Sequence, residues 1–228
     1  STGISNDQRL ICQNALRSPL MPLPGVSEMI AADVNPQIPE EEYLRLRTEI
    51  SESAYHVAMS IHELMELCLV DESTMLEMND YVGLNEIAMA ALNSYDMRNR
   101  ELSVDFKTNV DNDVNIQTNQ HAMQEIVNSL LSNADQFATG GVVEINCHAE
   151  ANGSYTLSIT NEGPGVPAKY AEKIFNPFFR LSEDNHTLGL GLTLALRLAA
   201  GMGYTLTLDT DYKRGVRFAL SGIKAVSE

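Results

Sequence analysis

The sequence predicts an α+β protein in which a helical hairpin, forming a dimeric four-helix bundle, precedes a two-layer α/β sandwich. Long helical patterns fill the first 70 residues, and helical patterns then alternate with short strands. With 44% hydrophobic residues, the 228-residue chain has enough apolar side chains to bury a core. We expect a dimerisation hairpin over 1–70, a linker over 71–84 and the sandwich over 85–228.

The hairpin is predicted from two helical stretches. Residues 39–69 begin with Pro39, which suits the first helical position, and three glutamates follow where the helix dipole favours acids. Residues 7–33 form the other stretch, which three prolines interrupt. The apolar positions of the second helix alternate steps of four and three: Ile50, Ala54, Val57, Ile61, Leu64 and Cys68. This is a coiled-coil seam, and a homodimer would bury it.

The remaining elements follow from periodicity and breakers. The patterns predict helices near 85–100, 119–138 and 190–201, and strands near 102–106, 114–117, 142–150, 154–160, 204–209 and 215–220. This order favours a mostly antiparallel sheet covered by helices.

Composition excludes several function classes. A net charge of -16 argues against a nucleic-acid partner, although more than half of the lysines and arginines fall in residues 114–228. No signal peptide and no run of about 18 apolar residues is present, so no membrane contact is expected within the chain. The three cysteines form no metal-type cluster and indicate a reducing compartment. We expect a cytoplasmic location, and the start at "STGISNDQ" is consistent with the cytoplasmic part of a longer membrane-anchored receptor.

Four blocks in the second half carry the chemistry. "EIVNSLLSNADQF" (125–137) places Glu125, Ser129, Asn133 and Gln136 on one helix face. "NEGPGVP" (161–167) is a glycine loop after a strand, and "IFNPFFRL" (174–181) is an aromatic segment. "TLGLGLTLAL" (187–196) is a second glycine loop that runs into a helix, where free N–H groups bind phosphate.

In this order the blocks resemble the N, G1, F and G2 boxes of the ATP-binding domain in sensor histidine kinases, a fold shared with Hsp90-like ATPases. "NALRSPLMPLPGVSEM" (14–29) is similar to the phospho-acceptor helix of the same family. The resemblance implies ATP or ADP with Mg²⁺, a homodimer and a response-regulator receiver domain as partner. The ATP contacts it implies come from Ser129, Asn133, Asn161, Gly163, Gly165, Phe178, Gly189, Leu190 and Gly191, with Ser129 also on the metal.

The sequence departs from the family pattern at several functional positions. Asn14 stands where the phospho-accepting histidine is expected and Ala15 where its neighbouring acid is expected. A carboxamide nitrogen is not a nucleophile, so autophosphorylation at this site is excluded. Asn161 replaces the acid that accepts the adenine amino group, and Ser129 replaces the metal-binding asparagine. Gln136 takes the place of a frequent lysine, and Thr187 that of the first G2 glycine.

These departures favour a degenerate, pseudokinase-like core that binds ATP or ADP weakly and relays a signal through its dimer. The alternative is an active protein-histidine kinase whose acceptor was engineered away at Asn14 or lies elsewhere, at His56, His62 or His121. A third interpretation is an ATPase that uses Glu125, the general-base position of the superfamily, to activate water.

Overall fold

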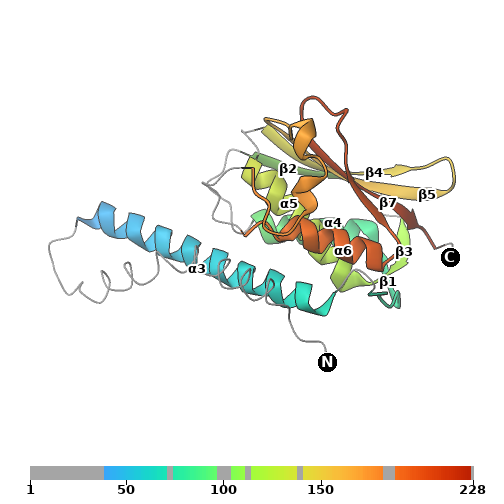
Figure 1. Ribbon diagram of the computed structural model, residues 1–228, viewed down its shortest axis with the longest axis horizontal. Coiled ribbons are helices and arrows are strands. Elements are labelled where there is room, and N and C mark those ends of the chain that lie inside the picture. The colour runs from blue at the N-terminus through green and yellow to red at the C-terminus, as the bar shows by residue number, and fades with distance from the viewer. Residues whose placement is uncertain are drawn as a thin grey trace. The chain divides into compact units, whose positions relative to one another are not determined.

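The structure is a computed structural model that describes residues 39–70, 74–96, 104–110, 114–137, 141–181 and 188–226. The chain divides into two compact units, drawn in Figure 1. The first contains residues 1–69 and 177–190, and the second contains residues 70–176 and 191–228. Asn14, Ala15 and the helix predicted over 7–33 lie outside the described residues.

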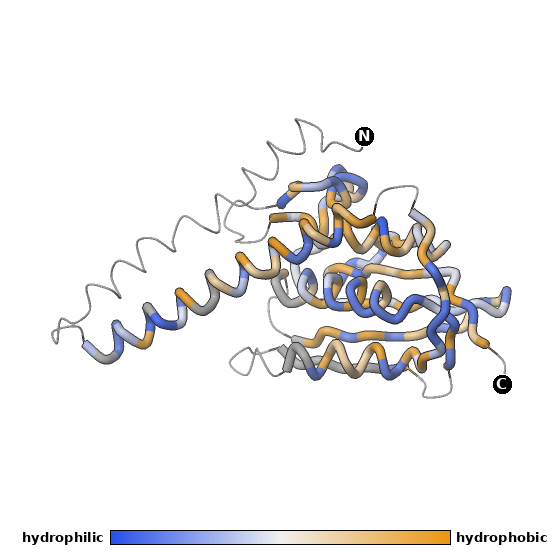
Figure 2. The backbone as a smooth tube through the Cα atoms, turned by 90° about the horizontal axis from the view of Figure 1, so that it is seen from below, coloured by the Kyte–Doolittle hydropathy of each residue, from blue (hydrophilic) through white to orange (hydrophobic). Residues whose placement is uncertain are grey.

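The described helix of the first unit is α3 (Glu40–Leu69), close to the prediction of 39–69. The Tyr43 amide donates to the carbonyl of Pro39 at 3.0 Å, so the first helical turn closes on this proline. Polar and apolar residues interleave along α3 (Figure 2). Amphipathic spacing of this kind stabilises a helix by burying one face.

The apolar residues that are exposed on α3 coincide only in part with the seam predicted from the sequence. Leu64 and Leu67 pack against a cluster of Phe178, Leu188 and Leu190 within the first unit. Because that contact occupies one side of the helix, the exposed apolar positions follow a neighbouring line. We call this line the α3 stripe: Ala54, Ala58, Ile61, Met65 and Leu69.

The second unit contains a five-stranded sheet with strand order β2-β4-β5-β7-β6. Its strands are β2 (Val104–Asn109), β4 (Gly141–Ala149), β5 (Ser154–Glu162), β7 (Gly215–Lys224) and β6 (Thr205–Leu208). The β2–β4 pair is parallel and the other pairs are antiparallel. The predicted α+β class with a mostly antiparallel sheet is therefore confirmed.

Three helices cover one face of this sheet (Figure 1). They are α4 (Leu84–Asp96), α5 (Gln120–Phe137) and α6 (Gly191–Gly201). The core lies between these two layers, because alternate strand residues are buried: Val143 and Ile145 on β4, Leu157 and Ile159 on β5, and Val216, Phe218 and Leu220 on β7. Period-two burial of this kind fixes the register and therefore the face on which each polar residue lies.

The segment predicted as a linker contains a strand. Residues Asp80–Gly83 form β1, which pairs antiparallel with β3 (Asn115–Thr118) in the second unit. Next to this pair, Tyr204 donates a hydrogen bond from its hydroxyl to Thr118 Oγ1 at 3.4 Å, and burial raises the pKa of the tyrosine. Thr118 in turn donates to the sulfur of Met202 at 3.4 Å. This buried network ties the small sheet to the end of α6.

Candidate nucleotide-binding site

Three half-buried side chains lie along one face of α5, as predicted from their spacing. Glu125, Ser129 and Asn133 follow one another at steps of four, while Ile126 and Leu130 beside them are fully buried. The helix starts after Asn119, whose Oδ1 accepts from the Ala122 amide at 2.9 Å in an N-cap arrangement. The side chain of Gln136 lies outside the described residues.

The hydroxyl of Ser129 is buried and has no hydrogen-bond partner among the described residues. Leaving a buried polar group unpaired costs about 1–3 kcal/mol. Such a group on the predicted ligand face fits a site that a bound molecule completes, and a serine oxygen is a ligand that Mg²⁺ accepts. The described residues contain no cluster of three His, Cys, Asp or Glu that could hold a metal ion.

Asn128 is engaged on a different side of α5. Its Oδ1 accepts from Gln124 Nε2 at 3.3 Å, and the same amide nitrogen also donates to the carbonyl of Ile87 on α4 at 3.5 Å. Adjacent helical residues differ by about 100° in direction. Asn128 therefore does not substitute for Ser129 on the ligand face.

Asn161, at the head of the first glycine loop, is 2% exposed and lies on the helix-covered face of β5. Its neighbours in the register, Val143 on β4 and Val216 on β7, are buried on that same face. The Asn161 side chain donates from Nδ2 to the carbonyl of Glu162 at 3.3 Å. Because Nδ2 is engaged in this bond, Oδ1 remains available as an acceptor. An adenine amino group requires such an acceptor.

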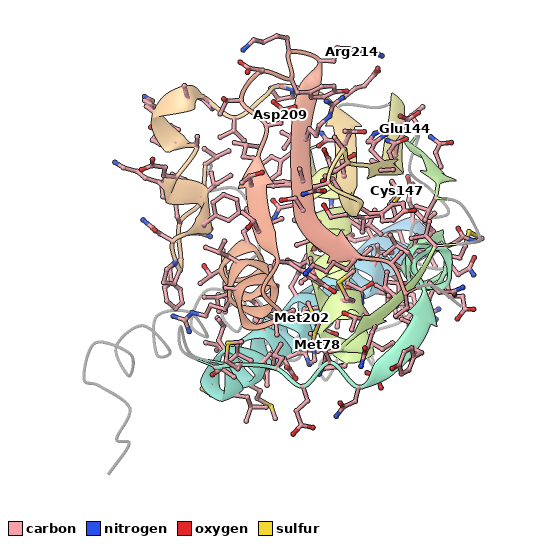
Figure 3. The ribbon with its side chains drawn as sticks, turned by 90° about the vertical axis from the view of Figure 1, so that its right-hand side faces the viewer. Met78, Glu144, Cys147, Met202, Asp209 and Arg214 are labelled. Atoms are coloured by element: carbon pink, nitrogen blue, oxygen red, sulfur yellow. The ribbon has the colours of Figure 1, made fainter. Side chains whose placement is uncertain are left out.

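The first glycine loop is held by the hairpin that joins β6 to β7. The Gly163 amide donates to the carbonyl of Arg214 at 3.1 Å, and the Arg214 side chain forms an ion pair with Glu162. Arg214 lies at the end of the sheet, beyond the labelled Asp209 (Figure 3). A Cβ at Gly215 would lie 2.0 Å from the carbonyl oxygen of Asn161, so only glycine fits there.

Gly215 is not among the residues predicted from the sequence. A glycine at the start of a strand commonly marks close approach of another backbone segment, and this is the signal that would have found it. The same corner includes Gly165, where a Cβ would lie 3.0 Å from the carbonyl oxygen of Gly215. The structure thus brings Asn161, Gly163, Gly165 and Gly215 together.

Phe178, Gly189 and Leu190 belong to the first unit. The Phe178 amide donates to the carbonyl of Gly189 at 3.0 Å, and both residues have left-handed backbone angles, with φ of 65° and 68°. A Cβ on Gly189 would lie 2.5 Å from the carbonyl oxygen of Phe179, so a glycine is required. The two predicted motifs are therefore bonded to each other, and Thr187 lies outside the described residues.

Gly191 opens α6 in the second unit, directly after this glycine motif in the chain. The first turn of any helix offers amide N–H groups without partners in the helix, together with the positive end of its dipole. Thr193 in this turn donates from Oγ1 to the carbonyl of Phe175 at 2.8 Å. Phe175 ends the short 3₁₀ turn η2 (Lys173–Phe175), so this bond fixes the start of α6 to the aromatic segment.

Comparison with known proteins identifies the family of the C-terminal domain. Residues 118–224 match the sequence profile of the family described as histidine kinase-, DNA gyrase B-, and HSP90-like ATPase. Curated sensor proteins match over 43% to 87% of this chain, and one of them is named a sensor histidine kinase. The chain contains a domain of this ATPase family and is similar to sensor histidine kinases. Residues 118–224 are its ATPase-family domain.

One similar protein is the sensor histidine kinase YcbM of Bacillus subtilis strain 168. It is 25% identical over 214 residues, which cover 87% of this chain and 65% of that protein. The heme sensor protein HssS of Staphylococcus saprophyticus is 23% identical over 180 residues, covering 77% of this chain and 39% of that protein. The chain therefore spans less than two thirds of the length of these relatives.

Two solved structures show the same fold. The histidine kinase AdeS of Acinetobacter baumannii superposes with a TM-score of 0.67 at 18% identity, covering 93% of this chain and 98% of that one. The mycobacterial sensor histidine kinase MprB gives a TM-score of 0.57 at 21% identity, covering 65% of this chain and 99% of that one. In the part of the chain that the structure describes, no helix is long and apolar enough to cross a membrane.

Proposed function

We propose that this chain is a sensor histidine kinase core that binds ADP or ATP weakly with Mg²⁺ and relays a signal without phosphorylating itself at position 14. The observation that carries the proposal is the orientation of Asn161. Its Nδ2 is engaged by the Glu162 carbonyl at 3.3 Å, and this favours presentation of Oδ1 to a 6-amino purine. The buried, unpaired hydroxyl of Ser129 supports a bound phosphate and metal on α5.

Weak binding follows from the chemistry of the residues present. A neutral amide accepts a weaker hydrogen bond than a carboxylate, and we assign a penalty of about 1–2 kcal/mol to Asn161. Gln136 brings no positive charge to the phosphates. Bound Mg²⁺ would neutralise part of the phosphate charge, and Ser129 is the residue that would hold it. Asn133, Gly163, Gly165, Phe178, Gly189, Leu190 and Gly191 are the further nucleotide contacts that we propose from the resemblance.

Relay without self-phosphorylation is proposed because position 14 has no nucleophile. Asn14 lacks the imidazole nitrogen that takes a phosphoryl group in the resembling family. Glu125 is half-buried on the nucleotide face of α5 and occupies the general-base position, which keeps slow ATP hydrolysis as a subsidiary activity.

The second candidate is an active kinase that phosphorylates a histidine elsewhere. Two backbone features favour this alternative because they are intact. They are the Phe178–Gly189 hydrogen bond and the close approach of Gly215 to Asn161. Of the histidines considered, His56 and His62 are half-buried on α3 and His121 is exposed in the first turn of α5. The His56 ring packs edge-on against Tyr55 with centroids 5.9 Å apart, as a structural side chain does.

We also propose a homodimer that presents its surface to a receiver domain of a response regulator, in the cytoplasm. The α3 stripe supports the dimer: Met65 is 62% exposed and Leu69 is 73% exposed within the whole chain. Exposed apolar positions at helical spacing favour a second helix as the partner.

Substitution of Asn161 by aspartate tests the nucleotide proposal. The Asn161→Asp variant should bind Mg-ADP about 5- to 30-fold more tightly, because a carboxylate replaces a neutral acceptor at the adenine amino group. Isothermal titration of ADP measures the change. IDP, which carries an acceptor in place of the amino group, is the matched control ligand and should bind neither protein measurably. If ADP and IDP bind the unaltered chain equally, Asn161 does not contact the base.

A further inference from the structure

The connection between α3 and the ATPase-family domain is bonded along its described length. Val70 follows the last residue of α3 and is 4% exposed. Its carbonyl accepts from Arg197 Nη1, on α6, at 3.3 Å. We define the strap as Val70 together with residues 74–80.

The strap is also bonded to the C-terminal end of α6. The Leu76 amide donates to the carbonyl of Gly201 at 2.9 Å. A Cβ at position 201 would lie 2.8 Å from the Thr74 carbonyl oxygen and 3.1 Å from Leu76 Cγ. The last residue of α6 must therefore be glycine for the strap to lie where it does. Figure 3 labels Met78 of the strap and Met202, the residue after α6.

The other end of the strap is attached to the start of α5. Asn119 Nδ2 donates to the Glu77 carbonyl at 3.1 Å, and the Gln120 amide donates to Asp80 Oδ2 at 2.8 Å. The Asp80 carboxylate thus pairs with one of the free N–H groups of the helix start. The strap joins α6, at the end remote from Gly191, to the start of α5, the helix that carries Ser129.

Helix α6 is the element that can transmit displacement along this path. It has 11 residues, a length of about 15 Å at 1.5 Å per residue. Its buried side chains, among them Leu194 and Leu198, pack it firmly into the domain. At its far end Thr193 bonds to the carbonyl of Phe175. Close-packed helices move as rigid bodies rather than deforming.

We propose that the strap is a relay: its bonds to α6 and α5 convert rotation of α3 into displacement of the helices that carry the nucleotide residues. Arg197 and Gly201 are the positioning residues of this relay. A connector without these bonds would absorb the same rotation in its own backbone. The effect on nucleotide affinity rests on the proposed function, but the mechanical coupling does not.

The test combines a change in helical phase with release of the strap. Insertion of one alanine after Ala58 rotates the rest of α3 by about 100°, whereas insertion of seven residues restores the phase to within about 20° and is the control. Hydrogen exchange of residues 191–201 in the full chain measures the displacement of α6, and titration with Mg-ADP measures the affinity. Each insertion is made in the unaltered chain and in the Arg197→Met/Gly201→Ala double variant. Gly83→Ala, where the nearest side-chain atom is 3.4 Å away, is the control glycine substitution.

The single insertion should change exchange in α6 by about 2- to 10-fold in the unaltered chain, the equilibrium change that one hydrogen bond provides. The change should disappear when the strap is released and persist in Gly83→Ala. An equal effect with and without the strap, or no effect in either, overturns the relay. If Gly201→Ala prevents folding, Arg197→Met alone must reduce the effect. Failure of ADP to bind any variant would contradict the proposed function and leave the exchange result to decide the relay.

Discussion

At the scale of single residues, Ser129 and Asn161 have buried polar atoms that lack some of their hydrogen-bond partners within the protein. The Ser129 hydroxyl has no partner among the described residues, whereas the Asn161 amide has a partner for its nitrogen. A buried group that is unpaired in the protein alone but suited to a ligand lowers stability and raises affinity at the same time. Stability and binding should therefore respond in opposite directions when it is removed.

The Ser129→Ala variant is expected to be more stable and to bind Mg-ADP less well. Removing the unpaired hydroxyl should stabilise the protein by about 1–3 kcal/mol, which raises Tm by roughly 2–4 °C for each kcal/mol in a chain of this size. Calorimetry without nucleotide measures the first effect and titration with Mg-ADP the second. Ser132→Ala, at an exposed position one turn further on, is the control. A Ser129→Ala protein that is less stable would mean that the hydroxyl is satisfied in the folded state.

Residue patterns gave the proposed members of the site but not the closest backbone approach beside them. Ser129, Asn133, Asn161, Gly163 and Gly165 follow from motif spacing. Gly215 does not, because its constraint comes from the carbonyl oxygen of Asn161, 54 positions earlier in the chain. A glycine in a strand signals that some backbone approaches closely, but which segment approaches depends on strand pairing that the sequence does not state.

At the scale of elements, α3 has two apolar sides with different roles. Leu64 and Leu67 face the cluster of Phe178, Leu188 and Leu190, while the α3 stripe is exposed. The predicted seam mixed residues from both sides because steps of four and three fit either line. Helix bounds were predicted well, since periodicity extends over many residues. Strand β1 was missed because four residues carry little pattern and its partner β3 lies far along the chain.

Substitution on the α3 stripe should weaken the proposed dimer. Met65→Glu places a charge within the stripe, and burying it against a second helix should raise the dimer Kd by at least about tenfold. Thr48→Glu adds the same charge at an exposed position of α3 that faces about 100° away, and it is the control. Sedimentation velocity over a concentration series measures both. Equal dimerisation of the two variants would place the partner on another surface.

At the scale of the whole molecule, the two ends of the proposed chemistry are changed together. We propose that Asn14 removes the acceptor in the hairpin and that Asn161 weakens the adenine contact in the ATPase-family domain. A chain that had lost only its acceptor would keep a tight nucleotide site. The joint departure favours a relay role, since both halves of phosphoryl transfer are affected.

Restoring both positions should restore labelling in steps. With labelled ATP and Mg²⁺, the unaltered chain should form no acid-labile phosphate, and Asn14→His should form little. Asn14→His/Asn161→Asp should form about 5- to 30-fold more than Asn14→His at subsaturating ATP, in proportion to the gain in affinity. Labelling of any histidine in the unaltered chain would instead support the active-kinase alternative. Asn14→Gln/Asn161→Asp, which has no imidazole at position 14, is the control.

The absence of space beside Gly201 also has a use in classifying related proteins. A Cβ at position 201 collides with the Thr74 carbonyl oxygen. A homologue with a larger residue there must therefore have a different backbone path before α4. One alignment column therefore distinguishes homologues that can follow this backbone route from those that cannot.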